Sequence, residues 1–238
     1  MAEELRATRI DARTAEAVRV DAGLRSYMLQ VYNYMASGLF LTGLIAAAVA
    51  YTPSVFNVIF GTPLKWVVML APIGIVFFLS ARLHRMSAAA AQAWFWGFAA
   101  LFGLSLASIF ALYTGLSITR VFFITAGTFG AMSLYGYTTK TDLSKFGSFL
   151  IMGLIGILIA GLVNIFIASS ALQFAISVIG VIVFVGLTAW DTQRIKEEYS
   201  AQDDTETAGK KAIFGALQLY LDFINLFIML LQLLGERK

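Results

Sequence analysis

The chain has 238 residues, of which 59% are hydrophobic and only 13% are charged, and its net charge is +3. A soluble domain carries about 25% charged residues, so a soluble domain and a nucleic-acid-binding protein are both excluded as interpretations. The absence of cysteine excludes disulfides, thiolate metal sites and cysteine nucleophiles.

The N-terminal arm, residues 1–26, mixes five acids with five arginines and has no apolar centre. We therefore expect a cytosolic arm, partly helical or disordered, rather than a cleaved signal peptide. Its alternative role is a docking element for another protein. Residues 27–238 are expected to form one transmembrane domain.

The transmembrane domain contains seven apolar runs of about 20 residues, the length that crosses a hydrocarbon core of about 30 Å. Continuous runs predict membrane helices, whereas a barrel would show short alternating strands. Pro72 lies inside the second run, where we expect a kink whose freed carbonyl is satisfied by a neighbouring helix. The runs cover residues 27–51, 64–80, 89–113, 118–137, 146–168, 171–190 and 212–234.

The distribution of lysine and arginine predicts the orientation in the membrane. The arm holds five, the connections after the second and fourth runs hold two each, and the connection after the sixth run holds four. Only Lys65 and Arg120 lie on the opposite side, so the N-terminus is predicted to be cytoplasmic. Arg237 and Lys238 would break this rule if the seventh run crossed fully. A seventh run that is buried by the other six, or one that dips in and returns, fits better.

Glycines in the fourth and fifth runs predict close helix packing. They include Gly127, Gly130, Gly136, Gly153, Gly156 and Gly161.

Asp191 and Asp222 are the acids that lie at the end of, or inside, an apolar run. An ionisable group at membrane depth costs about 2.5 to 3.5 kcal/mol on insertion scales, so it indicates ion or proton handling. Asp222 shares one helical stripe with other polar side chains, which is expected to face the bundle interior. The stripe comprises Gln218, Asp222, Asn225, Met229 and Gln232.

Whether the two aspartates meet is left open by the spacing. Asp222 lies eleven residues, about 16 Å, beyond Lys211, whereas Asp191 lies near the end of its run. If they met, the two carboxylates would share a proton and could hold a hard cation such as calcium. Alternatively, Asp191 is a solvated residue beside Arg194 and Lys196, and Asp222 is a structural acid.

Two arginines at the end of the second run, Arg82 and Arg85, could supply a counter-charge to the aspartates. Boundary arginines more often snorkel to the interface. His84 between them is expected to be solvated rather than a metal ligand. No catalytic motif is found, so no enzymatic activity and no tightly bound cofactor are expected.

Two blocks of sequence carry a family resemblance. The stretch from Gly103 to Gly156, which includes YGYTTKTDLS, and the block LYLDFINLF around Asp222 resemble the Bax inhibitor-1 family, also called TMBIM. The bacterial, YccA-like branch, which includes a modulator of the membrane protease FtsH, is most similar. The resemblance covers everything after the arm.

The resemblance implies a bundle in which six helices surround a central, polar seventh helix. It also implies a calcium leak of the bacterial inner membrane that closes when Asp191 and Asp222 share a proton. The family's gating arginine would fall on Arg82, with Arg85 as the alternative. The other implied function is modulation of FtsH without transport. The oligomeric state stays open, and a monomer is compatible with the sequence.

Overall fold

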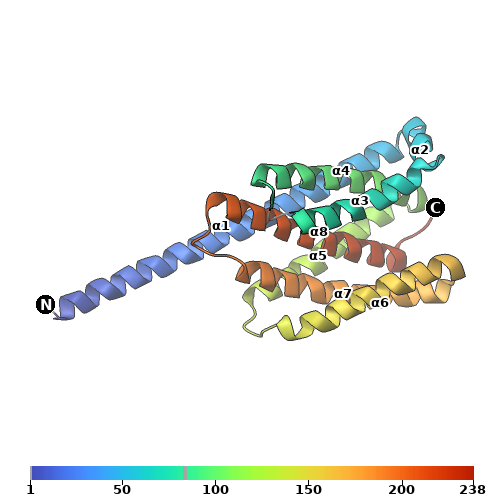
Figure 1. Cartoon of the computed structure of the whole chain (residues 1–238). Coiled ribbons are helices and arrows are strands. Elements are labelled where there is room, and N and C mark those ends of the chain that lie inside the picture. The colour runs from blue at the N-terminus through green and yellow to red at the C-terminus, as the bar shows by residue number, and fades with distance from the viewer. Residues whose placement is uncertain (1, 83–84) are drawn as a thin grey trace.

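The computed structural model describes residues 2–82 and 85–238, with side chains from residue 20 onward. His84 therefore lies outside the described residues. The described chain is all helical and contains seven helices that are long and apolar enough to cross a membrane, as expected for an all-α membrane protein. Figure 1 shows them as a bundle. The helices are α1 (Ala2–Ala50), α2 (Pro53–Phe60), α3 (Leu64–Arg82), α4 (Ala88–Leu112), α5 (Gly115–Thr138), α6 (Ser144–Ile167), α7 (Ser170–Glu197) and α8 (Thr205–Leu234).

All seven predicted apolar runs correspond to a long helix, but several helices extend beyond their runs. α1 continues without a break through the predicted arm, so the domain boundary at residue 26 is not a helix boundary. α7 continues seven residues past Trp190, and α8 begins seven residues before Ala212. Apolarity marks the part of a helix that lies in lipid, and polar turns at its ends escape this signal.

The short helix α2 lies between the first two apolar runs and is not among the predicted helices. Pro53 begins this helix, because its fixed φ and missing N–H suit the first helical position. Side-chain caps begin the longer helices: Ser87, Thr114, Ser169 and Asp204 each accept a hydrogen bond from a backbone N–H in the first turn of the following helix.

The proline inside α3 is accommodated by a neighbouring helix, as predicted. Pro72 has no N–H to donate to the carbonyl of Val68, four residues earlier. The hydroxyl of Ser105 on α4 donates to that carbonyl at 2.6 Å. This bond helps to hold α3 against α4.

The last helix, α8, lies at the centre of the bundle. Of its most apolar 18-residue window, 67% is buried, against at most 39% for the other six spans. α8 packs chiefly on α1, α4, α5 and α7, whereas α3 packs chiefly on α4 and α6 on α7. The predicted central helix is thus confirmed, and four helices rather than six form its immediate shell.

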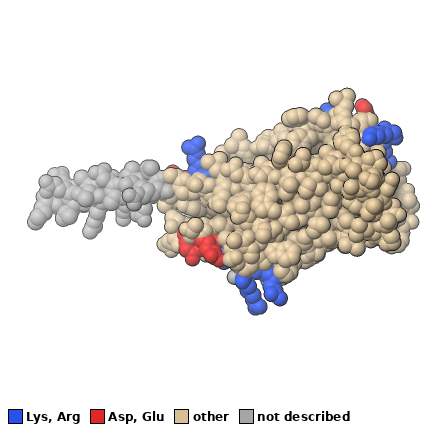
Figure 2. All heavy atoms as spheres, turned by 90° about the horizontal axis from the view of Figure 1, so that it is seen from above, with Lys and Arg blue, Asp and Glu red and all other residues tan. Residues whose placement is uncertain are grey.

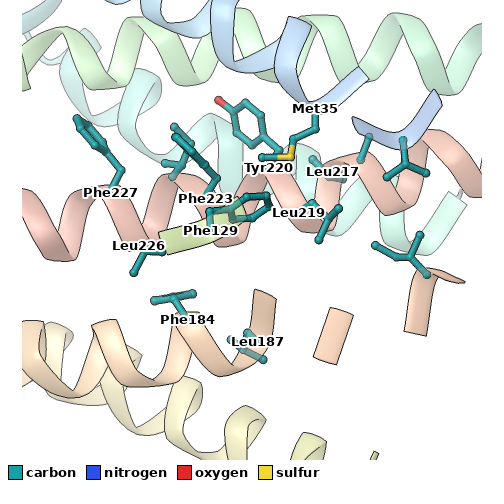
Figure 3. Packing of buried hydrophobic residues seen from close by; sticks show 14 of the residues in the cluster. Met35, Phe129, Phe184, Leu187, Leu217, Leu219, Tyr220, Phe223, Leu226 and Phe227 are labelled. Carbon is teal, nitrogen blue, oxygen red and sulfur yellow. The ribbon is translucent and has the colours of Figure 1, made fainter. Parts of the chain in front are cut away.

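An aromatic cluster around Tyr220, which Figure 3 shows on α8, fixes this helix against α1 and α4. The Tyr220 ring lies 5.2 Å from Phe98 and 6.3 Å from Phe95, both in edge-to-face orientations. Its hydroxyl shares a 2.7 Å hydrogen bond with Thr42 on α1, and Thr42 donates to the carbonyl of Ala99 on α4.

The outer faces of the bundle, in contrast to its polar ends, are apolar and exposed. On the face shown in Figure 2, charged side chains lie toward the two ends and the wide middle is uncharged.

The C-terminus shows that α8 crosses the whole bundle. The backbone N–H of Thr114, between α4 and α5, donates to the carbonyl of Glu236, and the N–H of Lys238 donates to the carbonyl of Leu112. The seventh run is therefore buried by its neighbours, as one alternative held, and the alternative that it dips in and returns is wrong. Neighbouring helices bury Asp222 and partly cover Gln218, Asn225 and Gln232, which helps the polar helix to cross.

The predicted role of glycines in helix packing is confirmed at two positions. A methyl group at Gly136 would lie 2.2 Å from the carbonyl oxygen of Ala189 on α7, and one at Gly153 would lie 2.9 Å from Val183. The prediction of close helix packing is wrong for four other glycines, because a methyl group on any of them would meet nothing within 4 Å. These are Gly127, Gly130, Gly156 and Gly161.

Candidate functional site

Asp191 of α7 and Asp222 of α8 meet in the interior of the bundle. Only 8% and 5% of their surfaces are exposed, so Asp191 is not the solvated helix-end residue of the alternative interpretation. The two carboxyl groups are neighbours that interact directly. Two carboxylates this close would repel each other, so a proton on one of the two groups would stabilise the pair.

The mismatch in depth disappears because α7 is longer than its apolar run. It continues past Trp190 to Glu197, which puts Asp191 more than one turn inside the helix. Trp190 itself packs on α6, where its ring fills the space beside Gly147. The apolar run ends at Trp190, although the helix does not. A helix bounded by the run alone would therefore put Asp191 too close to the surface.

Close approach of α7 and α8 brings the carboxyl groups together. The two helices are antiparallel neighbours, and Gly180 of α7 lies against Met229 of α8, where a methyl group would be 2.8 Å from the Met229 side chain. Toward the other end, Gly215 of α8 faces Ile195 of α7. Small residues on both sides of the pair thus set the spacing of the two helices.

The predicted polar stripe of α8 divides into two groups. Near the pair, Gln218 Oε1 and Asp222 Oδ2 are buried acceptors without a hydrogen-bond partner in the described part of the chain. Farther along, Gln232 Oε1 accepts from Ser177 Oγ and from Gln173 Nε2, each at 2.8 Å. Asn225 donates only to the carbonyl of Leu221 on its own helix.

The two polar groups are separated by an apolar layer. Figure 3 shows Phe184 and Leu187 of α7 opposite Leu226 of α8, and all three side chains are buried. The contact of Gly180 with Met229 continues this layer toward Gln232. A layer of buried apolar side chains therefore separates the carboxyl pair from the polar group around Gln232.

The cation that lies near the pair is Arg194, one turn after Asp191 on α7. Its Nε donates to Glu198 Oε1 at 3.2 Å, in a partly exposed ion pair. Arg82 and Arg85, the predicted counter-charges, are exposed at the end of α3 in the outer layer. The structure therefore does not bring either onto the aspartates, and their gating role stays a prediction.

A chain of hydroxyl groups beside the pair was not predicted. Tyr32 of α1 and Ser133 of α5 share a hydrogen bond of 2.5 Å, and Ser133 and Thr192 of α7 share one of 3.0 Å. Thr192 also donates to the carbonyl of Thr188. The chain links three helices at the level of Asp191. Its hydroxyl residues are scattered in the sequence, and no local pattern indicates it.

The donor set at the pair is small for a resident metal ion. Among the described residues there is no group of three or more histidine, cysteine, aspartate or glutamate side chains that could hold a metal. Calcium takes six to eight oxygen ligands, whereas the pair and Gln218 Oε1 offer only a few.

The fold and the site define a class: an all-α, multi-pass membrane protein whose central helix carries one half of a buried carboxyl pair. Comparison with known proteins gives the family. A family described as inhibitor of apoptosis-promoting Bax1 matches residues 24–238. The chain belongs to this family, which confirms the family resemblance of its sequence.

Relatives from several bacteria match along nearly their whole length. Inner membrane protein YbhL of Escherichia coli is 48% identical over 229 residues, which are 95% of this chain and 98% of that protein. An uncharacterized protein of Rickettsia prowazekii is also 48% identical, over 94% of this chain and 95% of its own. One from Deinococcus radiodurans is 41% identical, over 90% and 92%.

Proposed function

We propose that this protein is a pH-sensitive leak for calcium in the bacterial inner membrane, closed when Asp191 and Asp222 share a proton. The observation that carries the proposal is the contact of two buried carboxyl groups from different helices inside a membrane domain. The inner-membrane location is supported by the name of the YbhL relative. The distribution of basic residues supports a cytoplasmic N-terminus.

The closed state follows from the shared proton. With one proton between them, the carboxyl groups hold α7 and α8 together through a hydrogen bond, and the apolar layer around Phe184 and Leu226 stays packed. Buried polar groups that satisfy one another are stable in a low-dielectric interior. Acidic conditions therefore favour the closed bundle.

Loss of the proton opens the bundle in this mechanism. Two negative charges about 4 Å apart repel by about 4 kcal/mol at an effective dielectric constant of about 20. This energy corresponds to a bias of about a thousandfold between two conformations. The two carboxylates and Gln218 Oε1 then present oxygen ligands to a divalent cation, which prefers such ligands.

Calcium flux into liposomes that contain the purified protein tests this proposal. We expect the flux to rise with pH in the native protein, and Asp191→Asn and Asp222→Asn to remove the pH response. An asparagine keeps the shape and a hydrogen bond but cannot lose a proton. Asp142→Asn, an exposed carboxyl between α5 and α6, is the matched control and should leave the response intact. Unchanged pH dependence in both pair variants would refute the proposal.

The alternative is a protein that modulates the FtsH protease without transport, and that binds the protease through its N-terminal arm or through its helices. The side chains before Val20 are outside the described ones, so the alternative stays a prediction. Deletion of residues 1–21, followed by co-purification with the protease, tests it. Retained binding would exclude the arm as the docking element.

A further inference from the structure

A continuous groove runs between α1 and α5 along the depth of the bundle. α1 and α5 both pack on α8 but make little direct contact with each other. Three hollows of about 580, 590 and 430 Å³ follow one another between them. The first two share Phe129, and the last two share Phe122 and Phe223. We name these joined hollows the α1–α5 groove.

One end of the groove is lined by polar side chains, and the rest of the groove is apolar. Its polar end is lined by Arg25 and Tyr32 of α1 and by Tyr137 of α5. Lys196 lies 5.0 Å over the Tyr137 ring and donates to the Tyr137 carbonyl, so a second cation lies at this end. The rest is lined by aliphatic, aromatic and small side chains, with little polar surface.

The length of the groove matches the membrane. From Arg25 to Ala46, the lining residues of α1 cover about 32 Å at 1.5 Å per residue, close to a hydrocarbon core of about 30 Å. A groove at this depth opens onto lipid. Its apolar walls are matched by hydrocarbon, and its cationic end is matched by a phosphate group.

The groove is too narrow for a helix from a partner protein. One turn of a helix about 10 Å wide and about 5.4 Å long fills about 400 Å³. The three hollows therefore hold about four turns at most, although they run along about six turns of α1. An extended acyl chain is much thinner than a helix and can follow the whole groove.

We propose that a phospholipid occupies the α1–α5 groove, with an acyl chain between the helices and its phosphate beside Arg25. The floor of the groove is Phe223 of α8, whose ring lies 5.5 Å from Phe129 and 5.6 Å from Phe122 (Figure 3). Phe223 directly follows Asp222, so an acyl chain in the groove would reach the turn of α8 that carries this half of the carboxyl pair. The lipid site stands whether or not the protein conducts ions.

Two glycines make the groove testable. A Cβ atom added at Gly43 of α1 or at Gly130 of α5 would meet nothing within 4 Å. Both residues border the groove, so Gly43→Leu and Gly130→Leu add bulk to it from positions that are open at the Cβ atom. Gly127 of α5 also faces open space but does not line the groove, and Gly127→Leu is the matched control.

Photo-crosslinking gives the readout. The full chain is placed in bilayers of phosphatidylethanolamine and phosphatidylglycerol that contain a trace of phosphatidylcholine with a diazirine on its acyl chain. Lipid adducts are then mapped by mass spectrometry. We expect adducts on Phe223 and Phe129, although only 4% and 6% of their surfaces are exposed. Bulk lipid would label instead residues such as Phe166, which is 88% exposed.

The leucine variants decide between a seated lipid and bulk lipid. Gly43→Leu with Gly130→Leu should reduce the adducts on Phe223 and Phe129 several-fold and leave those on Phe166 unchanged, whereas Gly127→Leu should change neither. Labelling of Phe166 without Phe223 or Phe129 in the native protein would overturn the proposal, and this result needs no variant. Adducts that survive both leucines, or protein-to-protein crosslinks in the groove, would also overturn it.

Discussion

At the scale of single residues, the behaviour of the Asp191–Asp222 pair depends on the small number of charged groups inside the bundle. Asp191 and Asp222 are buried together, and the nearby Arg194 is occupied with Glu198 at the edge. Removing the proton from the pair therefore leaves negative charge without a buried positive partner. Such a charge is costly in a low-dielectric interior, so in the proposed mechanism the pair moves apart or takes up a cation.

Arg82 is predicted to act only after the pair separates, because it is exposed in the closed structure. Arg82→Gln should lower calcium flux at alkaline pH and leave the closed state at acidic pH unchanged. The reason is that a freed carboxylate would lose its charge partner. Flux measured with Arg85→Gln is the matched control. If Arg85→Gln, and not Arg82→Gln, lowers the flux, the assignment passes to Arg85.

Asp204 predicts an acid effect that is separate from the pair. The backbone N–H of Thr207 donates to this exposed N-cap carboxylate and lowers its pKa below the usual value. A lowered folded-state pKa means that the capping contribution is present above the unfolded-state pKa and is lost as the pH falls through the folded-state pKa. Amide exchange at Thr207 should therefore accelerate at strongly acidic pH. Asp204→Asn should remove this acceleration, and its persistence would contradict the assignment.

At the scale of helices, glycines decide how closely α5 and α7 approach. A methyl group at Gly136 would lie 2.2 Å from a backbone oxygen, which cannot move without moving α7. Gly136→Ala should therefore destabilise the protein by about 1 to 3 kcal/mol, measured as a loss of thermal stability in detergent. Gly127→Ala, on the same helix but facing open space, should be neutral or stabilising by up to about 1 kcal/mol. Equal losses in both variants would argue against the packing account.

The helices themselves could largely be predicted from the sequence, because each apolar run is long enough to cross a membrane. What could not be predicted depends on polar ends and on contacts between helices. The final turns of α7 carry charged residues, so Asp191 was placed outside the depth of Asp222. Helical spacing placed Asp222 in the interior correctly, but Gln218, Asn225, Met229 and Gln232 of the same stripe are only partly buried.

Other parts of the site depend on tertiary structure that no local pattern records. The hydroxyl chain from Tyr32 to Thr192 joins residues far apart in the sequence. The open space beside Gly130 could not be told from the close packing of Gly136, because both are glycines in the same apolar run. The exposure of Arg82 follows from the place of α3 in the outer layer, which composition does not indicate.

At the scale of the whole molecule, the path of α8 fixes where the two chain ends lie. An N-terminus and a C-terminus joined by seven spans lie on opposite sides, and the residues after α8 pair with the α4–α5 connection. Arg237 and Lys238 are thus expected outside, where Arg237 lies over the Tyr113 ring and Lys238 donates to the Phe110 carbonyl. Local partners explain why two basic residues are tolerated there.

The absence of cysteine from the chain makes this orientation easy to measure. A membrane-impermeant maleimide should label Lys238→Cys on intact cells. Ala201→Cys, in the exposed α7–α8 connection, should be labelled only after the membrane is opened. Labelling of both variants on intact cells, or of Ala201→Cys alone, would contradict the predicted orientation.

The central claim is that one shared proton holds α7 against α8. It is tested most directly by the distance between the Asp191 and Asp222 carboxyl groups in crystal structures determined at acidic and at alkaline pH. The account predicts hydrogen-bonding contact at acidic pH and separated carboxylates at alkaline pH, with the apolar layer around Phe184 and Leu226 opened. Carboxyl groups that stay in contact at both pH values, while calcium flux changes, would contradict it.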